Sequence, residues 1–117
     1  IKDWTESFAV NVTANVQLIR TLDPLLRASS AGRAIFVTSG LSLDIEPFFG
    51  SYAASKAAVN ALAQTWAAET KNTNLKVNLV RPGAVDTDML AQIFPGGYHG
   101  GDLRTPSDLT PLFVHLA

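Results

Sequence analysis

The sequence contains no cysteine, which excludes disulfide bonds and thiolate metal sites. Charge is also scarce, because charged residues make up 16% of the 117 residues and the formal net charge is -1. This balance gives no reason to expect nucleic acid or an anionic membrane surface as a partner. No apolar run approaches the roughly 20 residues that a membrane-spanning helix needs. Hydrophobic residues make up 47%, which favours a folded globular chain.

Apolar spacing and turn residues predict alternating helices and strands. Apolar residues recur at helical spacing after a start signal at Asp3, so a first helix is expected to run to about Arg27. A continuous apolar run at 34–38 predicts a strand buried on both faces of a parallel sheet. The other expected elements are a helix over 51–69 capped by Ser51, a strand over 76–80, a loop-rich segment over 86–105, and a final helix over 106–116 capped by Thr105 or Ser107.

This order of helix, strand, helix and strand is typical of a doubly wound α/β fold. We predict a single partial domain over residues 1–117, because two strands are fewer than the about five or six of a mean sheet. The first residue is Ile1 rather than Met, and a helix starts almost at once. We therefore expect the chain to begin within a fold, with any targeting signal upstream. The lack of cysteine fits a cytoplasmic location.

Tyr52 and Lys56 lie four residues apart near the start of the second predicted helix. This spacing places both side chains on one helical face, one turn apart. A free tyrosine titrates near about pH 10, and a neighbouring ammonium favours the phenolate. The pair is therefore a candidate proton-transfer device. Taken alone, it is equally compatible with an ordinary surface tyrosine and lysine, because the Tyr-x-x-x-Lys spacing is common.

Three further polar features lie where a ligand would bind in such a fold. Ser39 ends the first predicted strand, and ligands bind outside the carboxyl ends of parallel strands. Asn11 interrupts an apolar helical stretch, where its amide competes for backbone hydrogen bonds. Residues 78–87 read Asn-Leu-Val-Arg-Pro-Gly-Ala-Val-Asp-Thr and turn the backbone outward after the second strand. Each feature also has a plain structural alternative, namely a loop serine, a packing amide or a strand-ending turn.

Together these residues resemble the catalytic tetrad and the nicotinamide-side motif of the short-chain dehydrogenase/reductase family. The similarity rests on Val-Asn-Val at 10–12, the serine at the strand end, Tyr-Ala-Ala-Ser-Lys at 52–56, and the segment 78–87 with its Pro-Gly turn and threonine. It extends from about Trp4 to the end of the chain. The resemblance implies a Rossmann-like doubly wound parallel sheet with helices on both faces. It also implies catalytic roles for Asn11, Ser39, Tyr52 and Lys56.

The resemblance further implies a nicotinamide-dependent oxidoreductase, such as a carbonyl reductase or an alcohol dehydrogenase. Tyr52 would exchange a proton with the substrate oxygen, and Lys56 would assist it and bind the nicotinamide ribose. Ser39 would hold the substrate carbonyl or alcohol, and Asn11 would anchor a water of the proton relay. The residues expected to contact NADP(H) or NAD(H) are Tyr52, Lys56, Pro82, Gly83, Val85 and Thr87. Pairing through the two long helices would give a homodimer or homotetramer.

The sequence lacks three features of the family, one of which is the closing strand expected after Ala117. It contains neither a Gly-x-x-x-Gly-x-Gly turn, which would hold the cofactor pyrophosphate, nor an Asn-Asn-Ala-Gly stretch. We therefore expect the chain to be the catalytic-side portion of a longer protein, lacking the N-terminal nucleotide-binding half. The preference for NAD or NADP depends on residues of that missing half, and the sequence does not reveal the substrate.

Other functions stay open on the sequence alone. The chain is compatible with a noncatalytic, self-associating module and with an epimerase or dehydratase that shares Tyr-x-x-x-Lys. Residues 89–104 are compatible with a lid over a nonpolar substrate or with an ordinary mobile loop. His99 and His115 have no metal-ligand spacing with each other or with carboxylates, so we expect no metal site.

Overall fold

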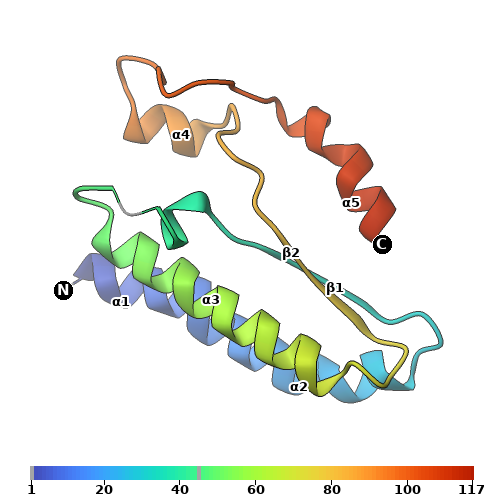
Figure 1. The fold of residues 1–117 in the computed structure, drawn as a ribbon. Coiled ribbons are helices and arrows are strands. Elements are labelled where there is room, and N and C mark those ends of the chain that lie inside the picture. The colour runs from blue at the N-terminus through green and yellow to red at the C-terminus, as the bar shows by residue number, and fades with distance from the viewer. Residues whose placement is uncertain (1, 45) are drawn as a thin grey trace. The chain divides into compact units, whose positions relative to one another are not determined.

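The computed structural model describes residues 2–44 and 46–117, which form two compact units. The first unit spans Ile1–Arg81 and the second Pro82–Ala117 (Figure 1). The first unit contains α1 (Lys2–Phe8), the π-helical turn η1 (Ala9–Thr13), α2 (Ala14–Ala28), β1 (Arg33–Val37), the 3-10 turn η2 (Gly40–Ser42), α3 (Gly50–Glu69) and β2 (Lys76–Val80). The second unit contains α4 (Asp88–Ile93), the 3-10 turn η3 (Pro106–Leu109) and α5 (Thr110–Leu116).

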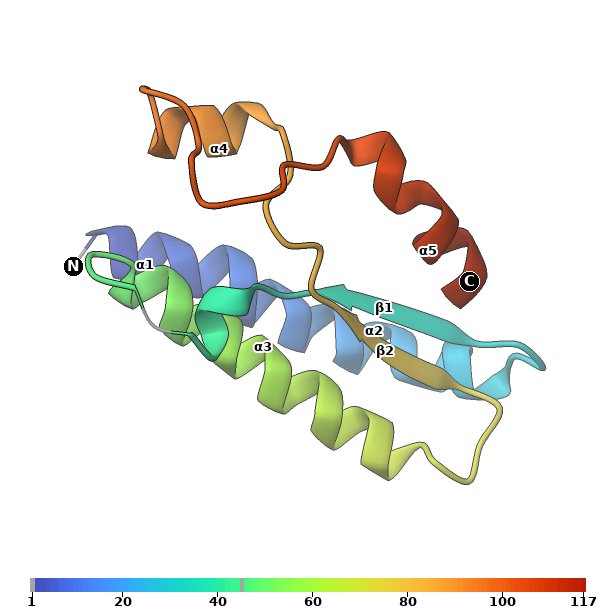
Figure 2. The ribbon, with the colours of Figure 1, turned by 45° about the horizontal axis from the view of Figure 1, so that its top comes forward.

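The first unit is a two-stranded parallel sheet with helices packed on one face. β1 pairs with β2 in a register that runs from Arg33 opposite Lys76 to Val37 opposite Val80. Figures 1 and 2 together show α2 and α3 running along the same side of the two strands. The buried core between these layers consists of Phe36, Val59, Ala63, Trp66 and Leu75. The predicted α/β class is confirmed.

The burial of the first strand differs from the sequence prediction. Phe36 faces the helices and is 9% exposed, whereas its neighbour Val37 is 44% exposed. The described residues of the first unit place all their helices on one face of the sheet (Figure 2). In this chain the strand is therefore buried on one face only, and the prediction that both faces are buried is wrong.

The long first helix contains a π-turn that the sequence did not predict. Helical backbone already begins at Lys2, so Asp3 lies within the first turn and not before it, which corrects the predicted start. The wider turn η1 separates α1 from α2, and Asn11 lies at its centre. Pi-turns are rare, occur mostly as single-turn insertions within α-helices, and are frequent at functional sites. The extra residue changes which side of the helix the positions after it occupy.

The second long helix begins without a side-chain cap. It starts at Gly50 and its N-cap residue, Phe49, makes no capping hydrogen bond, so the prediction of Ser51 as the cap is wrong. Trp4 of α1 lies against this end, because a Cβ added at Gly50 would come within 3.6 Å of its ring. Packing against α1, rather than a polar cap, therefore supports the first turn of α3.

A polar junction joins α2 to α3 near the C-terminal ends of both helices. The Trp66 indole nitrogen donates a hydrogen bond to Asp23 Oδ1 at 2.6 Å. Arg27 Nε donates to both carboxylate oxygens of Asp23, at 2.7 and 2.9 Å. The hydrogen bond from Trp66, followed by that from Arg27, lowers the pKa of the Asp23 carboxyl. The charged form of Asp23 is therefore favoured in the folded state.

This junction predicts a pH dependence of stability. Because the folded pKa of Asp23 lies below its unfolded value, its contribution is present above the unfolded pKa and is lost as the pH falls through the folded pKa. We expect Asp23→Asn to have a lower Tm than wild type at neutral pH, with the two values converging in acid. Thermal unfolding followed by circular dichroism across acid pH checks this. Exposed Asp44→Asn is the control, and a constant Tm difference at every pH would contradict the assignment.

The second unit is a turn followed by short helices. Gly83 adopts a φ of 76°, a region that L side chains rarely occupy, so the Pro-Gly turn depends on its glycine. A parallel bridge joins Val85 to Arg104. The helix α4 interrupts the predicted loop, and the helix predicted over 106–116 is present as η3 followed by α5. None of the helices described for residues 2–44 and 46–117 is both long and apolar enough to cross a membrane.

Candidate active site

Tyr52 and Lys56 lie together on the first turns of α3. The Lys56 ammonium is 5.7 Å from the centroid of the Tyr52 ring, and both side chains are half-buried. Lys56 Nζ also donates a hydrogen bond to the carbonyl oxygen of Val37, the last residue of β1, at 3.0 Å. The helical spacing predicted from the sequence thus brings the two residues together, next to the carboxyl end of a strand.

Partial burial affects the charge of Lys56. Loss of solvent around the ammonium lowers the pKa of Lys56 below its ordinary value. A cation within about 6 Å of an aromatic ring is attracted electrostatically to the face of the ring. Where less water surrounds a charge, its electrostatic interaction with neighbouring groups is stronger. Burial therefore disfavours the charged form of Lys56, although the charge that it carries acts strongly on the tyrosine and the strand end beside it.

Ser39 lies just beyond β1 and begins the turn η2. Its backbone is extended, and its hydroxyl oxygen accepts a hydrogen bond from the amide nitrogen of Leu41 at 3.2 Å. Because a hydroxyl has one proton and two lone pairs, this contact leaves the Ser39 proton available as a donor. The predicted position of the serine at the end of the first strand is confirmed.

Asn11 is linked to α3 through a buried serine. Its amide nitrogen donates to Ser55 Oγ at 2.9 Å, and Ser55 Oγ donates to the carbonyl oxygen of Tyr52 at 2.8 Å. Ser55 is fully buried, with an exposed fraction of 0%. The Asn15 amide nitrogen donates to the carbonyl oxygen of Asn11 at 2.7 Å. The π-turn thus holds Asn11 against the helical turn that carries Tyr52 and Lys56.

The four predicted catalytic residues all belong to the first unit, and α3 connects them. Lys56 approaches Tyr52 directly, and Asn11 reaches the same turn through Ser55. Ser39 is tied to α3 through two intervening side chains, because Ser42 Oγ donates to its carbonyl oxygen at 2.6 Å and Asn60 donates to Ser42 Oγ at 2.7 Å. One helix therefore contacts all four residues, and Lys56 and Ser39 lie at the end of β1.

The predicted cofactor-contacting residues Pro82, Gly83, Val85 and Thr87 lie in the second unit. Thr87 caps α4, because its hydroxyl oxygen accepts from the amide nitrogen of Leu90 at 3.3 Å and donates to the carbonyl oxygen of Val85 at 3.3 Å. A Cβ added at Gly83 would meet no atom within 4 Å, so the turn is open on that side. This segment forms a defined turn, and its contact with a cofactor stays a prediction.

Sequence reasoning missed the residues that connect the site. Ser55 stands within the motif Tyr-Ala-Ala-Ser-Lys, and Ser42 gives no signal beyond its residue type. Asn60 does lie four residues after Lys56, the spacing of one helical face, and this could have identified it. Ser42 could not have been found in this way, because a loop contact to a helix has no periodicity.

An aromatic pair lies in the glycine-rich segment. Phe94 and Tyr98 of the glycine-rich segment pack edge to face, with ring centroids 5.4 Å apart. Among residues 2–44 and 46–117, no three histidine or carboxylate side chains gather closely enough to hold a metal ion.

Comparison with known proteins identifies the family of this chain. The family model for short chain dehydrogenases matches residues 1–96. YciK of Escherichia coli K12, an uncharacterized oxidoreductase, is 37% identical over 113 residues, which are 97% of this chain and 44% of YciK. A chloroplastic NADPH-dependent aldehyde reductase-like protein of Arabidopsis thaliana is 35% identical over 89 residues, which are 76% of this chain and 33% of that protein.

Solved structures give the same result. A short chain dehydrogenase from Escherichia coli CFT073, crystallised as a complex with NADPH, superposes with a TM-score of 0.85 at 37% identity. The superposition covers 97% of this chain and 46% of the dehydrogenase. The chain therefore belongs to the short-chain dehydrogenase family. It spans about half the length of the curated relatives it matches.

Proposed function

We propose that the protein is an oxidoreductase that transfers a hydride between NAD(P)(H) and a carbonyl or alcohol substrate, with Tyr52 as the general acid or base. The observation that carries this proposal is the position of Lys56 Nζ, which is 5.7 Å from the Tyr52 ring centroid and hydrogen-bonded to the end of β1. A phenol beside a partly desolvated ammonium can give up or take a proton at the edge where parallel sheets bind ligands.

The residues of the site divide the proposed proton transfer between them. In carbonyl reduction, Tyr52 would donate its phenolic proton to the substrate oxygen, and Lys56 would stabilise the phenolate that remains. Ser39, whose proton is not used by the contact with Leu41, would hydrogen-bond the same oxygen. Asn11 would support the relay that returns a proton to the tyrosine, because Ser55 connects it to the Tyr52 carbonyl. In alcohol oxidation the same steps run in reverse.

The donor set near Tyr52 fits a nicotinamide cofactor, which supplies or accepts the hydride when it is bound. An ammonium has three donors, and Val37 takes one, so Lys56 keeps two donors for ribose hydroxyls. The open Pro82-Gly83 turn, with Val85 and Thr87 after it, would contact the nicotinamide side. The NADPH complex of the Escherichia coli structure and the name of the Arabidopsis relative both favour NADP(H), and NAD(H) is the alternative.

The proposal is tested on the full-length protein, which is the complete natural polypeptide to which these 117 residues belong. Calorimetric titration with NADPH and with NADH shows which cofactor binds. The absorbance of reduced nicotinamide, followed with a panel of aldehydes and ketones, shows turnover. Oxidation of the cofactor that depends on a carbonyl substrate is the expected result. Binding of neither cofactor would instead favour the noncatalytic alternative, which the family membership does not favour.

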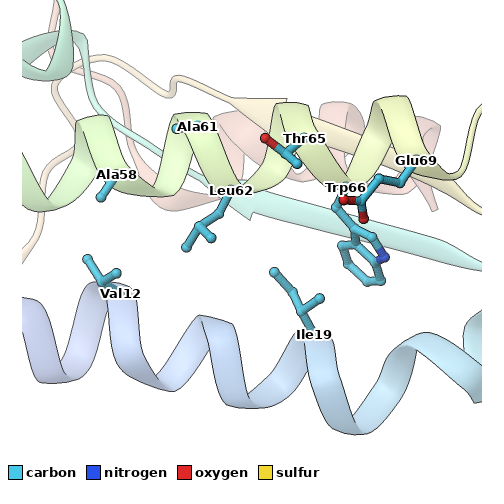
Figure 3. A pocket seen from close by; sticks show the side chains of 8 residues that line it. All are labelled: Val12, Ile19, Ala58, Ala61, Leu62, Thr65, Trp66 and Glu69. Carbon is cyan, nitrogen blue, oxygen red and sulfur yellow. The ribbon is translucent and has the colours of Figure 1, made fainter.

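We also propose that the protein forms a homodimer or homotetramer through α2 and α3. A groove of about 450 Å³ runs between these helices, and Figure 3 shows Val12 and Ile19 directed toward Leu62 and Trp66 across it. Small side chains at Ala58 and Ala61 allow a neighbouring helix to approach closely. The lining is mostly apolar, with Thr65 and Glu69 as its polar members, and this favours a second copy over a charged partner.

Self-association predicts a specific mutational effect. An arginine at Ala61 would place an unpaired charge within the apolar contact, so Ala61→Arg is expected to shift the full-length protein toward monomer. Light scattering coupled to size-exclusion chromatography measures the change in mass. Gln17→Arg adds the same charge at an exposed position outside the groove and serves as the control. Unchanged mass for Ala61→Arg would count against this interface.

A further inference from the structure

Asn60 connects α3, the helix of Tyr52 and Lys56, to the segment after β1 that contains Ser39. It lies on α3 at the same four-residue spacing that separates Tyr52 from Lys56. Its amide nitrogen donates to Ser42 Oγ at 2.7 Å, and Ser42 Oγ donates to the carbonyl oxygen of Ser39 at 2.6 Å. The amide nitrogen of Ser42 donates to the same carbonyl at 3.2 Å. The contact between α3 and η2 is therefore built on a polar bridge.

The direction of these hydrogen bonds is fixed by the single proton of Ser42. Because that proton is donated to the Ser39 carbonyl, Ser42 Oγ can only accept from Asn60. Asn60 must therefore present its amide nitrogen to Ser42. Its amide oxygen is buried and has no hydrogen-bond partner within the part of the chain that the structure describes. A buried acceptor without a partner is costly, so an apolar side chain of similar volume would serve packing at least as well.

The bridge also controls how the chain leaves β1. Ser39 is extended, with φ of -140° and ψ of 151°, and the backbone then turns sharply into η2. Fixing the Ser39 carbonyl at this bend fixes the plane of the following peptide. The neighbouring amide of Leu41 holds the Ser39 hydroxyl oxygen. The helix that carries Tyr52 and Lys56 thus determines where the Ser39 hydroxyl lies.

We infer that Asn60 is a positioning residue that sets Ser39 relative to Tyr52, acting through Ser42. This inference rests on the proposed function, because it assumes that the Ser39 hydroxyl contacts the substrate oxygen. It gives Asn60 a role in turnover without contact with substrate or cofactor. The positioning of Ser39 explains why a residue with a buried, unpartnered oxygen occupies position 60, whereas packing alone does not.

The test is a double-mutant cycle in the full-length protein. Asn60→Leu is expected to lower kcat about tenfold, because small displacements of a catalytic group are costly, and to leave the cofactor KM unchanged. Ser42→Ala breaks the same bridge and is expected to lower kcat equally, with no further loss in the double variant. In the Ser39→Ala background, Asn60→Leu is expected to change kcat by less than about twofold, since no hydroxyl is left to position.

Thermal unfolding and Gln64→Leu complete the design. Gln64 is exposed on the same helix, so Gln64→Leu is expected to keep wild-type kcat. Asn60→Leu is expected to keep the wild-type Tm, and Ser42→Ala provides the second route should the leucine variant not fold.

An unchanged kcat for Asn60→Leu and Ser42→Ala, with a reduced kcat for Ser39→Ala, overturns the positioning role alone. Equal losses from Asn60→Leu with and without Ser39 also overturn it, and full kcat for Ser39→Ala overturns it together with the assignment of Ser39.

Discussion

The Tyr52→Phe variant of the full-length protein is expected to lose about 10²- to 10⁴-fold in kcat, the range that general acid–base catalysis supplies. Phenylalanine keeps the ring that Lys56 approaches at 5.7 Å but removes the proton that reaches the substrate oxygen. Cofactor binding is expected to change little, because Lys56 keeps its position at the end of β1. Steady-state assays of cofactor oxidation, with calorimetric titration of the cofactor, measure the two effects separately.

Tyr98→Phe is the matched control for this prediction. Tyr98 packs edge to face against Phe94 in the glycine-rich segment, and its replacement removes the same phenolic oxygen elsewhere in the chain. We expect it to keep a kcat within about twofold of wild type, as substitutions away from reacting groups usually do. A Tyr52→Phe variant that is as active as Tyr98→Phe would show that the phenol at position 52 is not the acid or base.

Trp66→Ala has the largest expected effect on stability. Trp66 is 4% exposed, packs edge to face on Phe36 with ring centroids 6.0 Å apart, and donates to Asp23. Truncation would leave a cavity between α3 and the sheet, and such substitutions lower the free energy of unfolding by about 3–5 kcal/mol. Since α3 also carries Tyr52 and Lys56, loss of this anchor is expected to lower the temperature at which activity is lost. Urea denaturation followed by circular dichroism measures the change.

The chain offers a second tryptophan for comparison. Trp4 is 49% exposed and stacks on Phe8, so Trp4→Ala removes about as much side chain but less buried contact. Its expected loss is about 1 kcal/mol, in line with a partly exposed position. Equal losses from the two substitutions would contradict the assignment of Trp66 to the buried core.

The elements that bury apolar side chains could be predicted from the sequence. The strand at 76–80 has its predicted limits, and α3 ends at the predicted Glu69, because β-branched residues and alanine runs specify these elements locally. The spacing of Tyr52 and Lys56 on one helical face was predictable for the same reason. Helical geometry alone fixes which residues lie one turn apart.

The features that were missed depend on contacts between distant parts of the chain. The π-turn around Asn11 is accompanied by a hydrogen bond to Ser55, which lies 44 residues further on. The start of α3 at Gly50 depends on Trp4, and the bridge from Asn60 to Ser42 spans 18 residues. No local pattern encodes such contacts. The burial of β1 was predicted wrongly because apolar composition specifies that a strand can be covered, not how many faces this chain covers.

The most direct test is a crystal structure of the full-length protein with NADP+ and an unreactive alcohol or ketone analogue. The proposed function predicts that Tyr52 Oη and Ser39 Oγ both lie about 2.6–3.2 Å from the same ligand oxygen, with Lys56 Nζ on the ribose. A Tyr52 phenol that points into solvent or into the core, out of reach of the oxygen bound by Ser39, would contradict it.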